Sequence, residues 1–412
     1  MYTGAQMNKQ QFDQFNMKKT RKLSMPLFFK VLFPSFAVFL FIILLFNLLA
    51  KPRTFSSQEN RNLAQLPELS IESLADGSYF SALSAYQSDQ FVGRDYWIRM
   101  RNSTQKVLGF KENDGIYFGS DGYLLKHGDT LDEGKLNATL KTVDDFSKAN
   151  PDMRMTFLLV PGAQTVLSDK LPSGVSTEDA FPDRSKALEL TQGVLGNGNN
   201  TNFTYVNAEN FLKQADNTDR LYYKTDHHWT TYGAYTAFTN VKAAMGIDAP
   251  TPSFEVLPVS ESFQGTLASQ SGSFEEKDTI VVFRPIPTDI MPEVDYYVLY
   301  PDDKIKLSSC YRMEKLEEKD QYTLFFGGNY GRLEIHTTNL NDRKLLIFKD
   351  SYANCFIPFL IPYFQEIEII DPRYYYEDLD LLIRNEQITD VLFLYSENNF
   401  FEDVTLKDVL AG

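Results

Sequence analysis

An uninterrupted run of uncharged residues near the start of the chain limits most strongly what this sequence can fold into. Residues 31–50 read VLFPSFAVFLFIILLFNLLA and lie between Lys30 and Lys51. A helix crosses the hydrocarbon core of a bilayer, about 30 Å thick, in about 20 residues. Pro34 lies near the start of the run, where a helix tolerates proline best. The sequence therefore predicts a transmembrane helix over residues 31–50, and its unbroken length argues against a buried core helix.

A cleaved signal peptide is the other interpretation of this run. Signal peptides have apolar regions of about 7–15 residues, followed by a cleavage site with two small residues. Here the apolar run is longer and ends in NLLA, with Leu48 where the first of the two small residues would stand. We therefore favour an uncleaved anchor.

The run also divides the charge of the chain. The whole sequence has 40 Lys and Arg against 55 Asp and Glu, which gives a formal net charge of -15. Residues 1–30 hold six basic residues and one acid, so the acid excess lies entirely after residue 50. Basic residues beside a membrane helix remain in the cytoplasm, which predicts a cytoplasmic tail over residues 1–30 and a single-pass cell-membrane protein whose larger part faces outward. That acidic outward part is not expected to bind nucleic acid, because affinity for a phosphate backbone comes from Lys and Arg.

The composition of the chain is that of a folded protein. Hydrophobic residues make up 43% of the sequence and aromatic residues 14%, which is too rich for a disordered chain. The two cysteines, Cys310 and Cys355, are too few for a disulfide framework, and the sequence leaves open whether they pair. Four histidines leave little room for a metal cluster, and no cofactor is expected.

The outward part is expected to be a polar stalk over residues 51–75 followed by one domain over residues 76–412. Helical spacing of apolar residues covers 78–108, and residues 116–125 predict a hairpin around a Gly-Ser-Asp-Gly turn. Residues 250–340 change character, because helical spacing fades and short β-rich runs alternate with turns. We interpret this stretch as a β-rich insertion, with strands expected over 280–284, 296–300, 322–326 and 332–337.

Helices and apolar strands alternate on both sides of this insertion. Before it, a helix is expected over 131–149, a strand over 155–160 and a further helix over 231–245. After it, strands are expected over 344–348, 366–370 and 391–394, with helices over 353–364 and 379–385. Helices that alternate with continuous apolar strands are typical of a parallel sheet covered on both faces. The sequence therefore predicts an α/β domain.

Polar residues follow each of the last three predicted strands. These segments are Lys349-Asp350-Ser351, Asp371-Pro372-Arg373 and Tyr395-Ser396-Glu397-Asn398. In an open α/β sheet the site lies outside the carboxyl ends of the strands, so the three segments are expected to meet at one edge. Ser351 follows a strand directly and precedes a predicted helix, a geometry that projects its side chain beside backbone N–H groups. Ser351 is therefore a candidate nucleophile.

A serine nucleophile needs a base, and the segment KTDHHWTTYG offers one. Asp226 and His228 are two residues apart, so in an extended segment they lie on the same side. A carboxylate beside an imidazole fixes its tautomer and stabilises the imidazolium that forms when the ring takes a proton. Asp226, His227 and His228 can also form a purely structural corner, or be read as metal ligands. We do not expect a metal, because these consecutive side chains should not all converge on one ion and no further Cys or His cluster supports it.

The segment KTDHHWTTYGAY resembles the signature of the DHHW protein family, which is named for four of these residues. The resemblance spans nearly all of the chain after residue 50. Its other blocks are SQENR at 57–61, DQFVGRD at 89–95, FGGN at 326–329, KDSYAN at 349–354 and IDPRY at 370–374. As a set of spaced motifs the resemblance is specific.

The DHHW family is similar in turn to the SGNH-like domains of the alginate O-acetylation acyltransferases. In those acyltransferases an Asp-x-His pair precedes the serine, which reverses the usual SGNH order. The resemblance therefore implies an SGNH-like (flavodoxin-like, three-layer) domain with Ser351 as the nucleophile, His228 as the base and Asp226 as the residue that orients it. Lys349 stands where the usual Gly-Asp-Ser motif has glycine. The sequence therefore departs from the motif at the place where backbone N–H groups would contribute to an oxyanion hole.

Further residues are candidates for binding the oxyanion or the substrate. They are Arg373, Tyr395, Asn329, Asn398 and Trp229. Arg373 and Tyr395 fall roughly where the similar enzymes place such residues, and Asn329 lies in a Gly-Gly-Asn turn. The structural alternatives are an ion pair for Arg373, an ordinary turn residue for Asn329 and a packed side chain for each aromatic residue.

The resemblance implies an O-acyltransferase that moves acetyl groups to a cell-surface or exported polysaccharide. It also implies a partner, a multi-pass membrane-bound O-acyltransferase that passes the acyl group across the membrane. Two other functions stay open at this point. One is an esterase that removes acyl groups with the same residues, and the other is a non-catalytic envelope or polysaccharide-binding protein.

Overall fold

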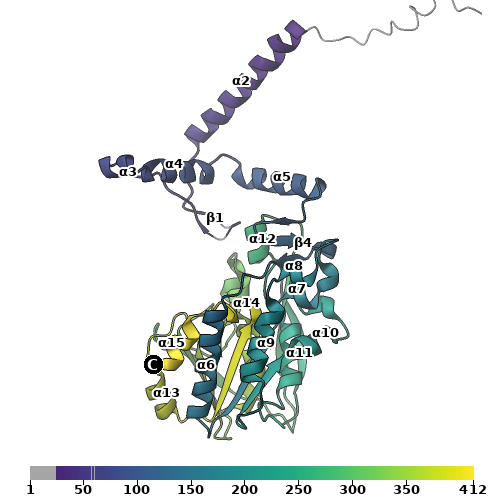
Figure 1. Ribbon diagram of the computed structural model, residues 1–412, viewed down its shortest axis with the longest axis vertical. Coiled ribbons are helices and arrows are strands. Elements are labelled where there is room, and N and C mark those ends of the chain that lie inside the picture. Colours follow the sequence, from purple (N-terminus) through teal and green to yellow (C-terminus); the bar gives the residue numbers. More distant parts are fainter. Residues whose placement is uncertain (1–24, 57, 60) are drawn as a thin grey trace, which may run out of the picture. The chain divides into compact units, whose positions relative to one another are not determined.

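The computed structural model describes residues 25–412 apart from residues 57 and 60, and most of the tail predicted over residues 1–30 lies outside this range (Figure 1). The chain divides into two compact units. The first comprises Met1–Phe55 and Asn62–Arg94, and the second comprises Ser56–Arg61 and Asp95–Gly412.

The first unit contains the apolar helix α2 (Met25–Leu49), which includes Pro34. Its stretch Phe28–Leu49 is long and apolar enough to cross a membrane and has no buried residue. No other helix among the described residues has this length and composition. The apolar run of the sequence is therefore confirmed as a helix.

Three helices follow α2 along the chain: α3 (Ile71–Ala75), α4 (Ser78–Asp89) and α5 (Arg94–Val107). The helical spacing predicted over 78–108 thus forms two helices, separated at Gly93, which adopts a positive φ of 66°. The side chain of Asn47 accepts a hydrogen bond from the N–H of Val92 (2.9 Å), which ties the end of α2 to the chain between α4 and α5.

The second unit is built around a mixed eight-stranded sheet in the spatial order β11-β10-β12-β14-β13-β15-β6-β7. The parallel strands are β6 (Arg154–Val160), β7 (Phe203–Asn207), β13 (Lys344–Lys349), β14 (Glu366–Ile370) and β15 (Asp390–Ser396). Antiparallel strands extend the β14 edge: β12 (Arg332–Thr337), β10 (Tyr296–Tyr300) and β11 (Ile305–Leu307). Every residue of β6 after Arg154 is buried, as expected of a strand covered on both faces. The predicted α/β class is confirmed.

Helices and a hairpin cover the two faces of this sheet, which makes three layers. One face carries α6 (Glu133–Ala149), α9 (Arg184–Leu195), α13 (Leu379–Glu386) and α15 (Thr405–Ala411). The other face carries α11 (Thr231–Val241) and the hairpin of β8 (Ser253–Phe263) and β9 (Asp278–Ile286). Figure 1 shows α6 and α9 in front of the sheet. The layers confirm the expected three-layer α/β architecture.

The parallel strands have the order of a flavodoxin-like sheet, but the chain enters that sheet at a different point. A flavodoxin-like sheet has the strand order 2-1-3-4-5. Counted from β13, the strands β13, β14, β15, β6 and β7 are numbers one to five, and their spatial order is β14-β13-β15-β6-β7. The last two strands of this count therefore come first in the sequence. A residue that follows β7 precedes one that follows β13 in the chain, although both stand at the same edge of the sheet.

The stretch over 250–340 contains two β structures. β8 and β9 pair with each other, whereas β10, β11 and β12 join the main sheet. The strand predicted over 322–326 is wrong, because the segment forms the 3-10 turn η5 (Gln321–Leu324). Its aromatic and β-branched residues favour a strand, but the hydroxyl of Thr323 donates to the carbonyl of Asp320 and closes the turn.

The helix predicted over 353–364 is also wrong. The segment forms three successive 3-10 turns: η6 (Ser351–Cys355), η7 (Ile357–Phe359) and η8 (Ile361–Tyr363). Pro358 and Pro362 lack the N–H that an α-helix requires, and each lies at the start of one of these turns. Cys355, which ends η6, and Cys310 are both free and buried, so they do not pair.

The remaining short elements connect these layers. They are β1 (Phe55–Ser56), β2 (Arg61–Asn62), β3 (Glu112–Asn113), β4 (Ile116–Phe118), η1 (Ser120–Gly122), β5 (Leu124–Lys126), α7 (Ala163–Val166), η2 (Ser168–Lys170), α8 (Thr177–Ala180), α10 (Glu209–Lys213), η3 (Thr218–Arg220), α12 (Thr266–Ser271), η4 (Met313–Glu317) and α14 (Glu397–Phe400). β4 and β5 form the hairpin predicted over 116–125.

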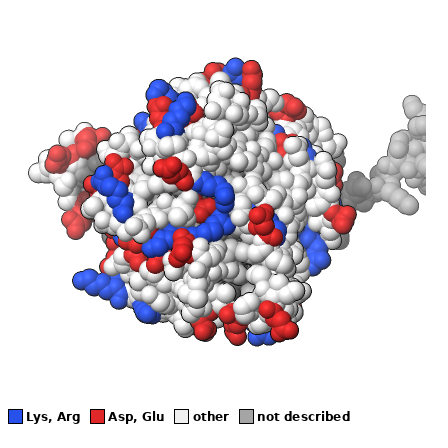
Figure 2. Space-filling model, turned by 90° about the horizontal axis from the view of Figure 1, so that it is seen from below, with Lys and Arg blue, Asp and Glu red and all other residues white. Residues whose placement is uncertain are grey.

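Acidic and basic side chains pair at the amino ends of the parallel strands. Arg343 Nη2 lies 2.5 Å from Asp390 Oδ1, and Lys344 Nζ lies 2.6 Å from Glu366 Oε2. Figure 2, seen from below the view of Figure 1, shows acids and bases intermingled over a whole face of the molecule. Neither sign of charge dominates that face.

Phe393, in the middle of β15, offers a test of the core. Its side chain is fully buried, and its ring lies 5.1 Å from that of Phe348 and 5.6 Å from that of Phe157. Phe393→Ala is expected to lower the free energy of unfolding by about 3–5 kcal/mol, because it removes a buried ring and leaves a cavity. Chemical denaturation measures this, with Tyr376→Ala as the control since Tyr376 is 90% exposed. Equal stability of the two variants would contradict the packing described here.

Candidate active site

The carboxylate of Asp350 holds two strand ends together. It lies between β13 and Ser351, and its Oδ1 accepts a hydrogen bond from the N–H of Tyr352 (2.9 Å). Its Oδ2 accepts from the N–H (2.9 Å) and hydroxyl (2.7 Å) of Ser396, the last residue of β15, and from the side chain of Asn399 (2.7 Å). The expectation that polar residues at the ends of β13 and β15 meet at one edge is confirmed.

The loop that carries Asp226 and His228 is held from β9. The carboxylate of Asp278, the first residue of β9, accepts hydrogen bonds from the N–H groups of Lys224 and Thr225, both at 2.8 Å, and from the hydroxyl of Thr225 (2.5 Å). Thr230 ends the loop and caps the N-terminus of α11 with its side chain. Both ends of the loop are thereby fixed.

His228 forms hydrogen bonds with Asp226 on one side and Ser351 on the other. Its Nδ1 lies 2.6 Å from Asp226 Oδ1, and its Nε2 lies 2.7 Å from Ser351 Oγ. A carboxylate only accepts hydrogen bonds, so Nδ1 carries the ring hydrogen and Nε2 accepts from the serine hydroxyl. All three side chains are buried, with Ser351 9% exposed. This arrangement can activate a serine hydroxyl as a nucleophile.

The second oxygen of Asp226 is occupied by α12. Oδ2 accepts hydrogen bonds from the N–H (2.7 Å) and the hydroxyl (3.0 Å) of Thr266. Burial alone would raise the pKa of Asp226, but the two neighbouring imidazoles and these hydrogen bonds outweigh it and hold the pKa well below its usual range. The carboxylate therefore stays ionised beside His228.

Tyr322 is part of the site, although no motif in the sequence marks it. Its ring stacks on that of His228, with centroids 3.8 Å apart and planes 11° apart. Its hydroxyl donates to the backbone carbonyl of Ser351 (3.1 Å). Tyr322 thus fixes the plane of the imidazole and contacts the serine backbone. An aromatic residue within a segment that favours a strand carries no local signal for such a role.

The sequence model of the DHHW protein family matches residues 59–131 and 197–370, which is more than half of the chain. This chain belongs to the DHHW protein family. Among solved structures, a DHHW family protein from Eubacterium siraeum has a TM-score of 0.59 at 22% identity, over 73% of this chain and 96% of the other. Bacillus cereus PatB1, solved with a sulfonyl adduct, has a TM-score of 0.56 at 21% identity, over 70% of this chain and 98% of the other.

A weaker likeness is to the O-acetyltransferase domain of Pseudomonas putida AlgJ, with a TM-score of 0.41 at 13% identity over 70% of this chain and 93% of that domain. A search of curated proteins finds no match to the sequence. The similarity to the first two structures shows a shared fold.

Two aromatic residues expected to contact the substrate are packed in the interior of this DHHW protein. Trp229 is fully buried, and its Nε1 donates to the carbonyl of Tyr352 (2.8 Å). Tyr395 is 2% exposed and packs against Phe157 and Phe400. The packed side chain that the sequence offered as the alternative is therefore present for both Trp229 and Tyr395.

Arg373 and Asn329 belong to a polar network at the ends of β13 and β14. Arg373 donates to both carboxylate oxygens of Asp371, at 2.8 and 2.6 Å. Asn329 accepts hydrogen bonds from Lys349 Nζ (2.7 Å) and from the side chain of Asn354 (3.1 Å). Lys349 is buried, which lowers its pKa, and its Nζ lies 3.4 Å from Asp371. The ion pair that the sequence offered as the alternative for Arg373 is therefore present.

A cavity of about 370 Å³ lies next to the group formed by Asp226, His228 and Ser351. His227, Thr266 and Tyr352 line it. Asn398 also lines it, and its side-chain oxygen accepts a hydrogen bond from Gln164 (3.2 Å), another lining residue. Of the candidate binding residues, Asn398 is the one that the described structure places in this cavity.

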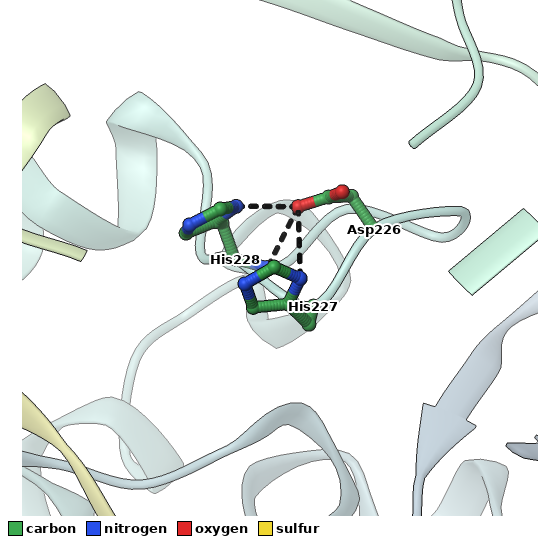
Figure 3. A group of neighbouring side chains, drawn as sticks. All are labelled: Asp226, His227 and His228. Atoms are coloured by element: carbon green, nitrogen blue, oxygen red, sulfur yellow. Dashed lines mark hydrogen bonds and ion pairs between the residues drawn. The ribbon is translucent and has the colours of Figure 1, made fainter. Parts of the chain in front are cut away.

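The expectation that three consecutive side chains cannot converge is wrong. Asp226, His227 and His228 offer ligand atoms that all lie within 4.8 Å of one another (Figure 3). Both imidazoles are nevertheless engaged in hydrogen bonds, because His228 Nδ1 donates to Asp226 and His227 Nδ1 lies 2.6 Å from Thr266 Oγ1. Hydrogen bonds account for the geometry of the group.

Gly265 is required by the close approach of Asp226. A Cβ at Gly265 would lie 2.2 Å from Asp226 Oδ2. Gly265→Ala is therefore expected to displace the carboxylate and to slow labelling of Ser351 by a sulfonyl fluoride by about 100-fold, the loss that a shift of ~1 Å can cause. Mass spectrometry measures the labelling. Gly193→Ala is the matched control, because a Cβ at Gly193 meets nothing within 4 Å; equal labelling of both variants would rule out this role for the glycine.

Removal of metal ions is expected to leave the site intact. The Nδ1 atoms of His227 and His228 are already engaged in hydrogen bonds with Thr266 and Asp226. Treatment with a chelator should therefore leave the rate of sulfonyl labelling at Ser351 unchanged, with zinc added back as the comparison. Loss of labelling on chelation, restored by zinc, would show that Asp226 and its neighbours form a metal site instead.

Proposed function

We propose that this DHHW protein is a membrane-anchored O-acyltransferase that acetylates a cell-surface or exported polysaccharide. The observation that carries the proposal is the pair of hydrogen bonds made by His228, at 2.6 Å to Asp226 and 2.7 Å to Ser351. Ser351 lies far along the chain from Asp226 and His228, and the three side chains have the arrangement of a nucleophile, a base and an orienting acid.

The first half of the proposed reaction forms an acyl-enzyme. His228 Nε2 takes the hydroxyl proton of Ser351 while Oγ attacks the acyl carbon of the donor, and the tetrahedral intermediate then expels the donor group, which takes the proton from His228. Asp226 stabilises the imidazolium during this step. Asn398, which lines the cavity, is our candidate for binding the oxyanion or the substrate.

The second half transfers the acyl group. A sugar hydroxyl gives its proton to His228 Nε2, its oxygen bonds to the acyl carbon, and Ser351 Oγ leaves and regains the proton. The product is an ester of the sugar and a free serine. An esterase would use water in place of the sugar, so the two reactions share the first half and differ in the acceptor.

The proposed location follows from α2 and the charge of the chain. Phe28–Leu49 can cross a membrane, and the basic residues before it favour a cytoplasmic N-terminus. The domain then lies outside the cytoplasm. Acyl donors of the cytoplasm are absent on that side of the membrane. The acyl group must therefore come through the membrane, and a multi-pass membrane-bound O-acyltransferase is the proposed partner.

Acylation of the full-length protein by 4-nitrophenyl acetate tests this function. Mass spectrometry is expected to find an acetyl adduct on Ser351 that moves to an added oligosaccharide in preference to water. Ser351→Ala should abolish the adduct, and Asp226→Asn should slow its formation by about 10⁴-fold, since the imidazole then loses its orientation. Ser262→Ala, at an exposed serine of β8, is the control. Release of the adduct to water alone would assign an esterase, and absence of an adduct would falsify the proposed mechanism.

A further inference from the structure

The hydrogen bonds of Thr266 determine which nitrogen of His227 carries the hydrogen. Thr266 Oγ1 lies 3.0 Å from Asp226 Oδ2, which only accepts, so the hydroxyl donates its single hydrogen there. The same oxygen lies 2.6 Å from His227 Nδ1 and must therefore accept a hydrogen from that nitrogen. In the neutral ring, Nε2 is then left with a lone pair and acts as a hydrogen-bond acceptor.

Three observations keep this acceptor available to a molecule in the cavity. His227 lines the cavity, and its side chain is 31% exposed. Burial and the neighbouring His228 lower the pKa of His227 to about 3, and the charge of Asp226 offsets this only in part. The ring therefore stays neutral near pH 7. In Figure 3 its second nitrogen points away from Asp226.

His227 also lies close to the reacting serine. Its ring centroid is 3.9 Å from that of His228, whose Nε2 contacts Ser351 Oγ at 2.7 Å. His228 and Ser351 do not line the cavity themselves, but His227, which does, lies directly beside them. A sugar whose reacting hydroxyl meets His228 therefore brings a neighbouring hydroxyl close to His227. Adjacent hydroxyl groups are the defining feature of a sugar ring.

The charges of the cavity are balanced. Its lining contains two acids and two bases: Glu59, Asp320, Lys126 and Lys319. The bases are already engaged, since Lys319 Nζ donates to the carbonyl of Gln264 (2.7 Å) and Lys126 Nζ lies 3.3 Å from Asp129. The other polar lining groups are mostly amides, such as Gln164 and Asn398, and hydroxyls, such as Ser269. Such a lining suits the hydroxyl groups of an uncharged sugar better than a uronate.

We infer that this cavity is the acceptor site, that it takes a neutral sugar, and that His227 Nε2 accepts a hydrogen bond from a sugar hydroxyl next to the one that is acylated. The inference rests on the proposed function, because its consequence is that the acyl group moves to a sugar in preference to water. His227 does not move a proton in the reaction. It positions the acceptor.

Two substitutions distinguish the contribution of His227 Nδ1 from that of His227 Nε2. The amide of Asn ends near the place of Nδ1 and can keep the bond to Thr266, but it provides nothing at Nε2. The longer side chain of Gln brings its amide oxygen near the place of Nε2. His227→Asn should therefore lose the acceptor contact, whereas His227→Gln should keep much of it. His336→Asn, on β12 and outside the cavity lining, is the control.

The first measurement is binding, in the full-length Ser351→Ala protein, so that no chemistry intervenes. The probes are xylopentaose and chitopentaose, which are neutral, and pentagalacturonate, which is acidic. We expect a neutral probe to bind more tightly than the acidic one. His227→Asn should weaken that binding by roughly tenfold, the effect of one lost hydrogen bond, while His227→Gln and His336→Asn should change it by less than about threefold.

The second measurement uses the intact serine and 4-nitrophenyl acetate as donor. His227→Asn is expected to raise the KM for the bound sugar and to lower the ratio of transfer to hydrolysis by roughly tenfold, and His227→Gln should restore the ratio. Three outcomes would each overturn the inference. The acidic probe binds more tightly, or no probe binds, or binding and transfer are unchanged by His227→Asn. Acylation lost equally in both His227 variants would overturn it too, since His227 would then act in the first half of the reaction. Binding that depends on His227 without any Ser351 adduct would leave the acceptor site standing and remove the proposed transfer.

Discussion

The hydrogen bond between His228 and Ser351 joins residues that lie 123 positions apart in the chain, and the surrounding structure is arranged so that it can form. On one side Asp278 holds the loop that carries His228, and on the other Asp350 fixes the backbone that carries Ser351. Both supports are buried carboxylates, and each accepts two hydrogen bonds from the backbone and at least one more from a side chain. Such charge-assisted bonds are short and directional, so they fix positions where packing alone would leave freedom.

The order of strands explains why Asp226 and His228 precede Ser351 in the sequence. In a flavodoxin-like sheet counted from β13, the serine follows the first strand and the Asp-x-His segment follows the fifth. In this chain β6 and β7 come first, so the same arrangement in space is read in the opposite order along the sequence. The reversal is a property of the connections between strands and leaves the edge of the sheet unchanged.

Much of the fold could be predicted, because the parallel strands are buried on both faces and must be apolar throughout. The strands expected over 155–160, 344–348, 366–370 and 391–394 are present as β6, β13, β14 and β15. β7 escaped prediction because it is the last strand at one edge of the sheet, is only partly buried and reads FTYVN. The helix expected over 353–364 is absent because the segment contains two prolines, which interrupt an α-helix although the apolar pattern favours one.

The site divides in the same way. Ser351, His228 and Asp226 could be found because their chemistry is tied to residue type and to short spacings. Tyr322, Thr266 and Gly265 could not be found. Their roles come from contacts with residues tens of positions away in the sequence. The ring of Tyr322 stacks on His228, and the hydroxyl of Thr266 donates to Asp226. Gly265 leaves room for the Asp226 carboxylate because it has no side chain. No local pattern distinguishes such residues from ordinary ones.

The position of β15 has a consequence for the order in which the protein can fold. β15 pairs with β13 on one side and with β6 on the other, so it is the strand that joins the two halves of the sheet. It is also the last of the eight strands of this sheet to be synthesised. β6 and β7 can pair early, but the free edge of β6 stays unsatisfied until β15 arrives, and an open apolar edge is a site for wrong pairing. The segments that carry His228 and Ser351 therefore come together when β15 joins the two halves of the sheet, and a nascent chain that stops short of Ser396 lacks the complete strand that links them.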